Sequence, residues 1–139
     1  MDVIVLIGRI LFAFLFLTSG YAHFAQRGMM VPYAASKGVP AAMTAVLGGG
    51  VLLLAGGLSV LLGVWADLGA LLLVVFLVPT AIMMHGFWKE TDPQARQMET
   101  VQFSKDLALA GASLMLFAFF SFTGENLGLT ITGPLFNLR

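Results

Sequence analysis

Four long apolar segments, separated by shorter polar ones, account for most of the chain. The clearest runs from 40 to 63 and contains no charged residue over its 24 positions. As a helix it would be about 36 Å long, which is enough to cross the roughly 30 Å hydrocarbon core of a bilayer. Similar runs occur at about 4–21, 67–87 and 102–122. The pattern therefore predicts four membrane-spanning helices.

The first connection, His23–Val39, has mixed polarity. Within it, Pro32 favours the beginning of a short helix that would continue through Lys37 at the membrane interface. Pro40 then favours the start of the second spanning helix, where a missing backbone N–H costs nothing.

The third spanning helix is expected to begin at Asp67, whose side chain is suited to capping a helix N-terminus. Pro79 should bend this helix, because proline removes a backbone hydrogen bond and crowds the preceding turn. The segment Lys89–Thr100 is the only strongly hydrophilic one, and its Asp92-Pro93 pair predicts a loop.

Helices joined by short connections pack as an antiparallel bundle. We therefore predict an all-α fold, an integral membrane antiparallel four-helix bundle over 1–124, followed by a surface-lying tail over 125–139. Both termini would share one end of the bundle, called side A, and the His23–Val39 and Lys89–Thr100 connections would share the other, called side B. Side B holds more lysine and arginine, so the positive-inside rule places it in the cytoplasm.

The composition agrees with a membrane protein and excludes several classes of function. The chain is 59% hydrophobic and only 10% charged, whereas soluble domains are about 25% charged. Seven basic residues balance seven acidic ones, so no net charge attracts nucleic acid. There is no cysteine, which excludes disulfides, thiol catalysis and iron–sulfur ligation. The two histidines do not make up a structural zinc site, and no metal site is predicted.

Small residues recur along the second spanning segment. Gly49, Gly56 and Gly63 are seven residues apart, and Ser59 precedes Gly63 by four. In lipid, small side chains let helix backbones approach closely. We expect this segment to be the central helix against which the others pack.

Arg9 lies inside the first apolar run, where a cation is costly unless it finds a partner or reaches the interface. Asp67 is expected near the same end of the bundle. Three interpretations stay open: an ion pair between Arg9 and Asp67, a contact from Arg9 to lipid phosphate, and a site for an anionic or carbonyl-bearing ligand.

A second polar group is expected on side B, where five side chains should converge at one membrane depth. They are His23, His85, Gln102, Lys105 and Asp106. A histidine beside a carboxylate can relay protons near neutral pH, and a histidine with a lysine can hold a quinone oxygen. The alternative is that these residues only anchor helix ends at the interface.

Four motifs occur in order along the spanning segments: GRILFAFLFLTSGYAHF, LLLAGGLSVLLGV, AIMMHGFW and QFSKDLALAGASL. This order resembles the DoxX family of small four-helix bacterial membrane proteins. The resemblance implies a multi-pass protein of the bacterial plasma (inner) membrane. The family shares its name with the membrane subunit of a thiosulfate:quinone oxidoreductase, and another relative is linked to a membrane redox-stress complex.

By this resemblance, Arg9, His85, Lys105 and Asp106 fall where the family tends to keep polar residues. The chain departs from the family pattern twice: 52–54 is all leucine where many members carry an acid, and Asp106 stands where many have asparagine. The first departure removes a catalytic carboxylate from the second helix.

Three functions follow as alternatives. The resemblance favours an accessory or anchor subunit of a quinone-linked redox or oxidative-stress assembly, with quinone as the one implied ligand and no intrinsic cofactor. A small transporter or lipid-binding protein would instead have Arg9 and Pro79 lining a cavity that reaches the middle of the membrane. A structural subunit would use the glycine face to contact other membrane proteins. No nucleophile–base pair or phosphate loop is present, so catalysis by the chain alone is not predicted.

Overall fold

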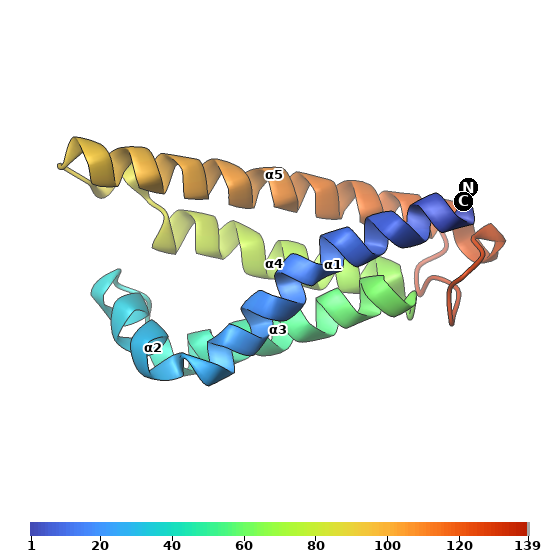
Figure 1. The fold of residues 1–139 in the computed structure, drawn as a ribbon, viewed down its shortest axis with the longest axis horizontal. Coiled ribbons are helices and arrows are strands. Elements are labelled where there is room, and N and C mark those ends of the chain that lie inside the picture. Colours follow the sequence, from blue (N-terminus) through green and yellow to red (C-terminus); the bar gives the residue numbers. More distant parts are fainter. Residues whose placement is uncertain (139) are drawn as a thin grey trace.

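The computed structural model describes residues 1–138, and their secondary structure is entirely helical (Figure 1). The elements are α1 (Asp2–Ala25), α2 (Arg27–Ser36), α3 (Ala42–Leu62), α4 (Ala66–Met84), η1 (Phe87–Lys89), α5 (Pro93–Thr123) and η2 (Gly124–Asn126). Four of these segments are long and apolar enough to cross a membrane: α1, α3, α4 with its extension to Lys89, and α5 with its extension to Asn126. The predicted all-α four-helix membrane bundle is confirmed.

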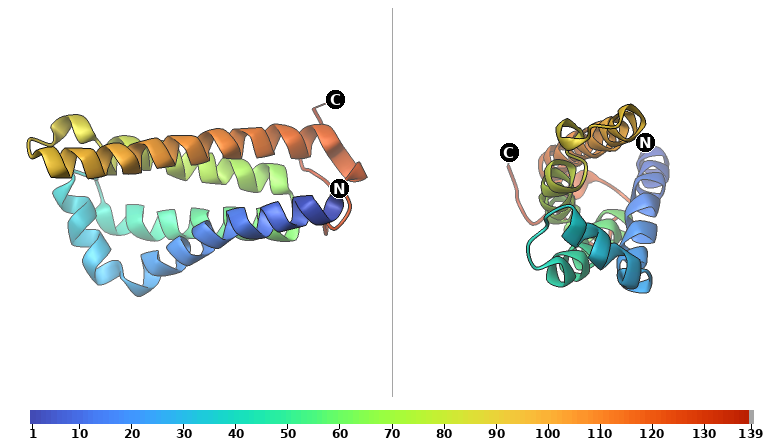
Figure 2. Two further views of the ribbon diagram at one scale, coloured as in Figure 1. Left: turned by 45° about the horizontal axis from the view of Figure 1, so that its top comes forward. Right: turned by 90° about the vertical axis from the view of Figure 1, so that its left-hand side faces the viewer.

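The spanning helices pack mainly with their neighbours in sequence, α1 on α3, α3 on α4 and α4 on α5. Both termini lie at one end of the bundle, and the short helix α2 lies at the other (Figure 1). α1 is inclined to α5, so the two are closest near the termini and separate toward α2 (Figure 2). The side B half of the bundle is therefore wider than the side A half.

Glycines on two faces of α3 allow this close packing. A Cβ atom on Gly56 would lie 2.7 Å from Leu73 of α4, and one on Gly50 would lie 2.7 Å from Phe24 of α1. Gly49 likewise faces Phe76 of α4. The adjacent residues Gly49 and Gly50 thus allow close approach of two different helices, α4 and α1.

The other two predicted packing residues lie at the end of α3. Gly63 ends the helix with a φ of 65°, a left-handed conformation that suits glycine. Ser59 donates hydrogen bonds to the carbonyl oxygens of Val64 and Trp65 at 2.6 and 3.0 Å. Both residues therefore shape the turn into α4.

The segment predicted as the Lys89–Thr100 loop is mostly helical, and that prediction is wrong. α5 begins at Pro93, where the Asp92 carboxylate accepts a hydrogen bond from the Ala95 amide at 2.8 Å. Asp92 followed by Pro93 thus starts a helix, with the acid as N-cap and proline in the first turn. At 31 residues, α5 is about 46 Å long and extends beyond the bilayer core.

Three other helix starts also differ from expectation. α2 begins at Arg27 and contains Pro32 rather than beginning there. α3 begins at Ala42, because Ala41 adopts a positive φ of 47° and leaves Pro40 in the preceding turn. The cap position of α4 is Trp65, also at positive φ, and the Asp67 side chain is used elsewhere.

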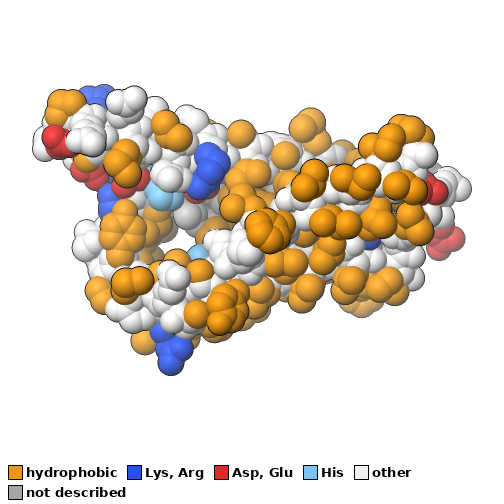
Figure 3. Space-filling view, viewed as in Figure 1, with side chains coloured by type: hydrophobic (Ala, Val, Ile, Leu, Met, Phe, Trp, Pro, Cys, Tyr) orange, Lys and Arg blue, Asp and Glu red, His pale blue; other side chains and the backbone are white. Residues whose placement is uncertain are grey.

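The core is densely packed from the middle of the bundle to side A. Phe16, Val60, Leu73 and Phe120 are buried there, one from each spanning helix, and Leu127 of the C-terminal tail joins them. The outer surface is rich in apolar side chains (Figure 3). Large exposed examples occur on every spanning helix: Leu11, Phe14, Val51, Leu58, Val75, Ile82, Leu114 and Met115. Such a surface suits contact with lipid.

Candidate functional site

A cavity of about 420 Å³ opens in the side B half of the bundle. Its walls come from α1, α2, α3, α4 and α5, and the space-filling view shows the hollow with histidine side chains at two places around it (Figure 3). Leu52 and Val75 line its deep part and lie at the midpoints of α3 and α4. The cavity therefore reaches about half-way along the spanning helices.

Most of the cavity lining is apolar, including Val46, Phe76, Met83 and Met84. The polar lining comes from a few side chains, namely Ser19, His23, Tyr33, Thr80, His85, Lys105 and Asp106. Four of the five residues expected to converge on side B thus share this cavity. The fifth, Gln102, lies beside it and accepts a hydrogen bond from Lys105.

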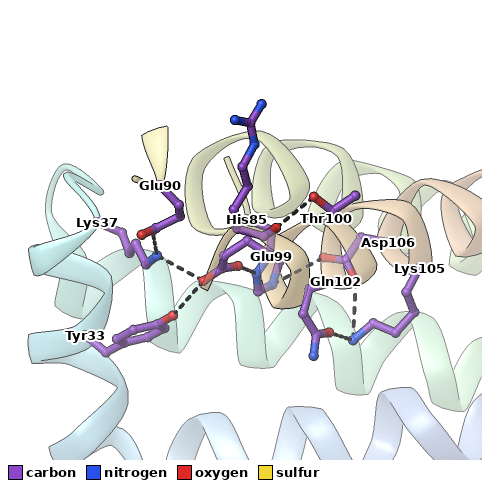
Figure 4. A network of polar contacts seen from close by, with 10 residues as sticks. Tyr33, Lys37, His85, Glu90, Glu99, Thr100, Gln102, Lys105 and Asp106 are labelled. Atoms are coloured by element: carbon purple, nitrogen blue, oxygen red, sulfur yellow. Dashed lines mark hydrogen bonds and ion pairs between the residues drawn. The ribbon is translucent and has the colours of Figure 1, made fainter. Parts of the chain in front are cut away.

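His85 stands between two carboxylates of α5 (Figure 4). Its Nδ1 lies 2.7 Å from Glu99 Oε2, and its Nε2 lies 3.7 Å from Asp106 Oδ2. Glu99 and Asp106 are seven residues apart, which places them on one face of the helix. His85 follows the last residue of α4, so the end of that helix places the imidazole ring against this face of α5.

Glu99 also joins the cluster to α2. Its Oε1 lies 3.0 Å from Lys37 Nζ and accepts a hydrogen bond from the Tyr33 hydroxyl at 3.4 Å. Lys37 also pairs with Glu90 at 3.0 Å. The network therefore links α2, the segment after α4, and the first turns of α5 across the mouth of the cavity.

The charges in this network nearly balance. The hydrogen bond from Lys37 to Glu90 and the further contact with Glu99 raise the pKa of Lys37 above its usual range, despite its partial burial. At the other end, Lys105 lies 3.8 Å from Asp106, with its side chain about half exposed. Two cations, Lys37 and Lys105, thus face the three carboxylates of Glu90, Glu99 and Asp106.

Lys37, Tyr33 and Glu99 were not among the predicted site residues. Glu99 was missed because the segment around it was expected to be a loop, which hides its seven-residue spacing from Asp106. With Pro93 as a helix start, that spacing alone would have pointed to it.

His23 lies in the wall formed by α1. Its Nδ1 is 2.8 Å from the carbonyl oxygen of Ser19, one turn earlier in the same helix. The side chain is buried, and its ring meets the Phe76 ring edge-on at 5.6 Å between centroids.

Arg9 lies far from the cavity, at the side A end. Its three guanidinium nitrogens donate to the carbonyl oxygens of Val60, Leu129 and Leu61 at 2.8, 2.7 and 2.6 Å. The carbonyls of Val60 and Leu61 belong to the last turn of α3, where helix carbonyls lack helical partners. Arg9 is 3% exposed and is satisfied by backbone.

The predicted ion pair between Arg9 and Asp67 is wrong, because Asp67 also bonds to backbone. Its two carboxylate oxygens accept from the amides of Leu135 and Phe136 in the C-terminal tail, at 2.9 and 2.6 Å. Asp67 is fully buried. Arg9 and Asp67 therefore hold the tail against the bundle and do not contribute to the cavity.

Comparison with known proteins gives two matches. The family model described as DoxX matches residues 4–86, which contain nearly all of α1 to α4. The inner membrane protein YphA of Escherichia coli is 29% identical over 114 residues, which is 82% of this chain and 81% of that protein. No solved structure matches. Because the family model covers more than half of the chain and four helices can span a membrane, this chain belongs to the DoxX family and is a multi-pass protein of a bacterial inner membrane.

Proposed function

We propose that the protein binds a lipid-soluble ligand of the quinone type in the side B cavity. We further propose that it does so as an accessory or anchor subunit of a quinone-linked redox or oxidative-stress assembly. The observation that carries the binding proposal is the cavity, which is apolar at mid-membrane depth and polar at its mouth. Its volume of about 420 Å³ lies in the range of small-molecule sites, roughly 300–1,000 Å³.

The cavity matches an amphipathic molecule in polarity and position. The apolar wall between Val46 and Phe76 suits a hydrocarbon chain, and the polar groups near His85 and Asp106 suit an oxygen-bearing ring. Such a ligand is dissolved in the bilayer, so it can arrive without crossing water. A partner protein would carry out electron transfer, while this chain holds the ligand near that partner.

The assembly role draws support from the DoxX membership and from the shape of side B. α5 begins well outside the bilayer core, and α2 lies beside its first turns, where Lys37 contacts Glu99. These turns offer a polar platform on which a membrane-associated protein could dock.

A cavity-filling variant tests the binding proposal. Ala45 lines the cavity with an exposed side chain, so A45F should place an aromatic ring in the ligand's space. We expect the affinity for a short-chain ubiquinone or menaquinone, measured by calorimetry in nanodiscs, to fall about tenfold or more. The matched control is A108F, at an exposed α5 alanine outside the cavity lining, which should bind as the wild type does.

Two results would contradict the proposal: no binding to the wild-type protein, or equal affinities for wild type and A45F. The redox role has a separate test, in which H85A and D106A are expressed in membranes and quinone-linked electron transfer is measured. Unchanged rates with normal protein levels would remove the role of the side B cluster in that transfer.

The cavity also favours a second candidate function, a lipid-binding protein or small transporter. Pro79 lines the cavity, and the cavity reaches the midpoint of α3 and α4, although Arg9 does not line it. Mass spectrometry of lipids retained after purification separates the two functions. The lipid-binding or transport function would be favoured if the wild-type protein retained stoichiometric phospholipid, if A45F lost it, and if quinone did not displace it. The structural-subunit hypothesis stays a prediction, which co-purification in mild detergent can test.

A further inference from the structure

We propose that His23 accepts a hydrogen bond from the ligand, so that the cavity selects the hydroxyl-bearing form of an aromatic ligand. A phenol or hydroquinone would then bind in preference to a quinone or an aryl ether of the same shape. The inference rests on the proposed function, because it concerns a ligand in the same cavity.

The hydrogen bond that His23 already makes decides what its other ring nitrogen can do. A carbonyl oxygen only accepts, so the contact with Ser19 requires a hydrogen on Nδ1. In a neutral imidazole, Nε2 is then the acceptor. Among the hydrogen bonds of residues 1–138, none uses Nε2. Nε2 is therefore free to accept a hydrogen bond from a ligand.

The ring that carries this acceptor is buried and held in position by packing. His23 is 8% exposed and lines the cavity. A Cβ atom on Gly50 would lie 2.9 Å from His23 Cβ, and one on Gly49 would lie 3.6 Å from the ring carbon Cδ2. Gly50 therefore leaves space for the Cβ of His23, Gly49 lies in ordinary contact range of its ring, and the Phe76 ring packs against that ring in a T-shaped arrangement. An acceptor held this way loses little freedom when a ligand binds.

The opposite polar wall adds a second acceptor. Asp106 presents a carboxylate to the cavity, and a carboxylate only accepts. Lys105 is the cationic donor of that wall, but its ammonium group already contacts Gln102 and Asp106. A hydroquinone can donate to both of these acceptors, whereas a quinone carries only acceptors and leaves His23 Nε2 and the Asp106 carboxylate without a donor from the ligand. A buried polar group without a hydrogen-bond partner costs more binding free energy than a typical hydrogen bond contributes.

The test uses two probes that differ only in a methyl group in place of the hydroxyl hydrogen, 4-octylphenol and its methyl ether. Affinities for the wild-type protein in nanodiscs at about pH 8, where an ordinary histidine is neutral, should favour the phenol. Because the probes partition differently into lipid, the measured quantity is the phenol-to-ether affinity ratio in wild type divided by that ratio in H23N. The amide introduced by H23N would keep a donor for the Ser19 carbonyl and would have no atom at the Nε2 position. We expect this quotient to be about ten.

A second variant, H23F, keeps an aromatic ring in the space beside Gly49 and Gly50, and should give the same quotient. Circular dichroism and a single gel-filtration peak identify variants that remain folded, and either one suffices. A quotient near one, with both probes still bound and still sensitive to A45F, overturns the role of His23 while the binding cavity stands. Preference for the ether or for a quinone over its hydroquinone in wild type overturns it as well. Failure of both probes and of quinone to bind wild-type protein overturns the proposed function together with the inference.

Discussion

Charged side chains find different kinds of partner at the two ends of the bundle. At side A, Arg9 and Asp67 form their hydrogen bonds with backbone groups, and apolar side chains pack in the core around them. At side B, His85, Asp106 and Lys105 contact one another at longer distances and line a cavity. A charge satisfied by backbone mainly stabilises the fold, whereas a charge that faces a cavity can still change partners. The same chain thus separates a structural end from a candidate binding end.

The strongest test of this comparison removes the Arg9 guanidinium. R9M should lower the free energy of unfolding by about 3–5 kcal/mol, because three backbone carbonyls lose a charged donor in a buried site. R9K should recover only part of this loss, since one ammonium group cannot reach three carbonyls in fork geometry. Unfolding in detergent, followed by circular dichroism, measures the effect. Wild-type stability in R9M would show that the side A end is not structural.

The two buried aspartates allow a matched comparison. In D67N, a carboxamide replaces the carboxylate whose two oxygens accept short hydrogen bonds from backbone amides. The amide NH₂ group cannot accept, so this variant should lower the free energy of unfolding by about 2–4 kcal/mol. D106N alters contacts of 3.7 and 3.8 Å and should cost less than about 1 kcal/mol while weakening ligand binding. Equal losses of stability in the two variants would contradict the proposed division between the ends.

Glu99 is the side B residue expected to matter most for stability, because it has partners on two elements. E99A removes the 2.7 Å contact to His85 and the 3.0 Å contact to Lys37, and should cost about 1–2 kcal/mol. The matched variant E90A loses only the contact to Lys37 and should cost less. If E90A proved the more damaging change, Glu99 would not be the centre of the cluster.

Lys37 should give the smallest effect. K37M should lower the free energy of unfolding by at most about 1 kcal/mol, because its ion pairs are partly exposed to solvent. Its partners raise its pKa, so the stabilisation is complete at neutral pH and is lost only as the pH rises through that raised value. High salt should reduce the difference between K37M and wild type. A difference that is insensitive to salt would indicate a packing role for the side chain.

The sequence predicted the spanning helices well, because apolar length is a direct requirement of the bilayer. It predicted the convergence of His23, His85, Lys105 and Asp106, since alternating helices bring equivalent ends together. It did not predict the start of α5, because Asp92-Pro93 is compatible with both a turn and a helix N-terminus. That single ambiguity concealed Glu99.

The partners of Arg9 and Asp67 could not be predicted, for a different physical reason. Pairing rules based on charge predict that an arginine and an aspartate at one membrane depth attract each other. Backbone carbonyls at the end of α3 and amides in the tail compete for the same side chains, and nothing in the sequence pattern marks them. A cavity reaching the middle of the membrane was expected only under the transporter hypothesis, which placed Pro79 in its lining correctly and Arg9 wrongly. Its location on side B could not be predicted, because it depends on the angle of α1 to α5 (Figure 1).

The hold of Asp67 on the tail has a consequence for biosynthesis. Translation proceeds from the N-terminus, so α4 and its acid enter the bilayer long before Leu135 and Phe136 leave the ribosome. During that interval the carboxylate has no tail amides to satisfy it. We expect water, lipid headgroups or an insertase to shield this acid until Leu135 and Phe136 emerge.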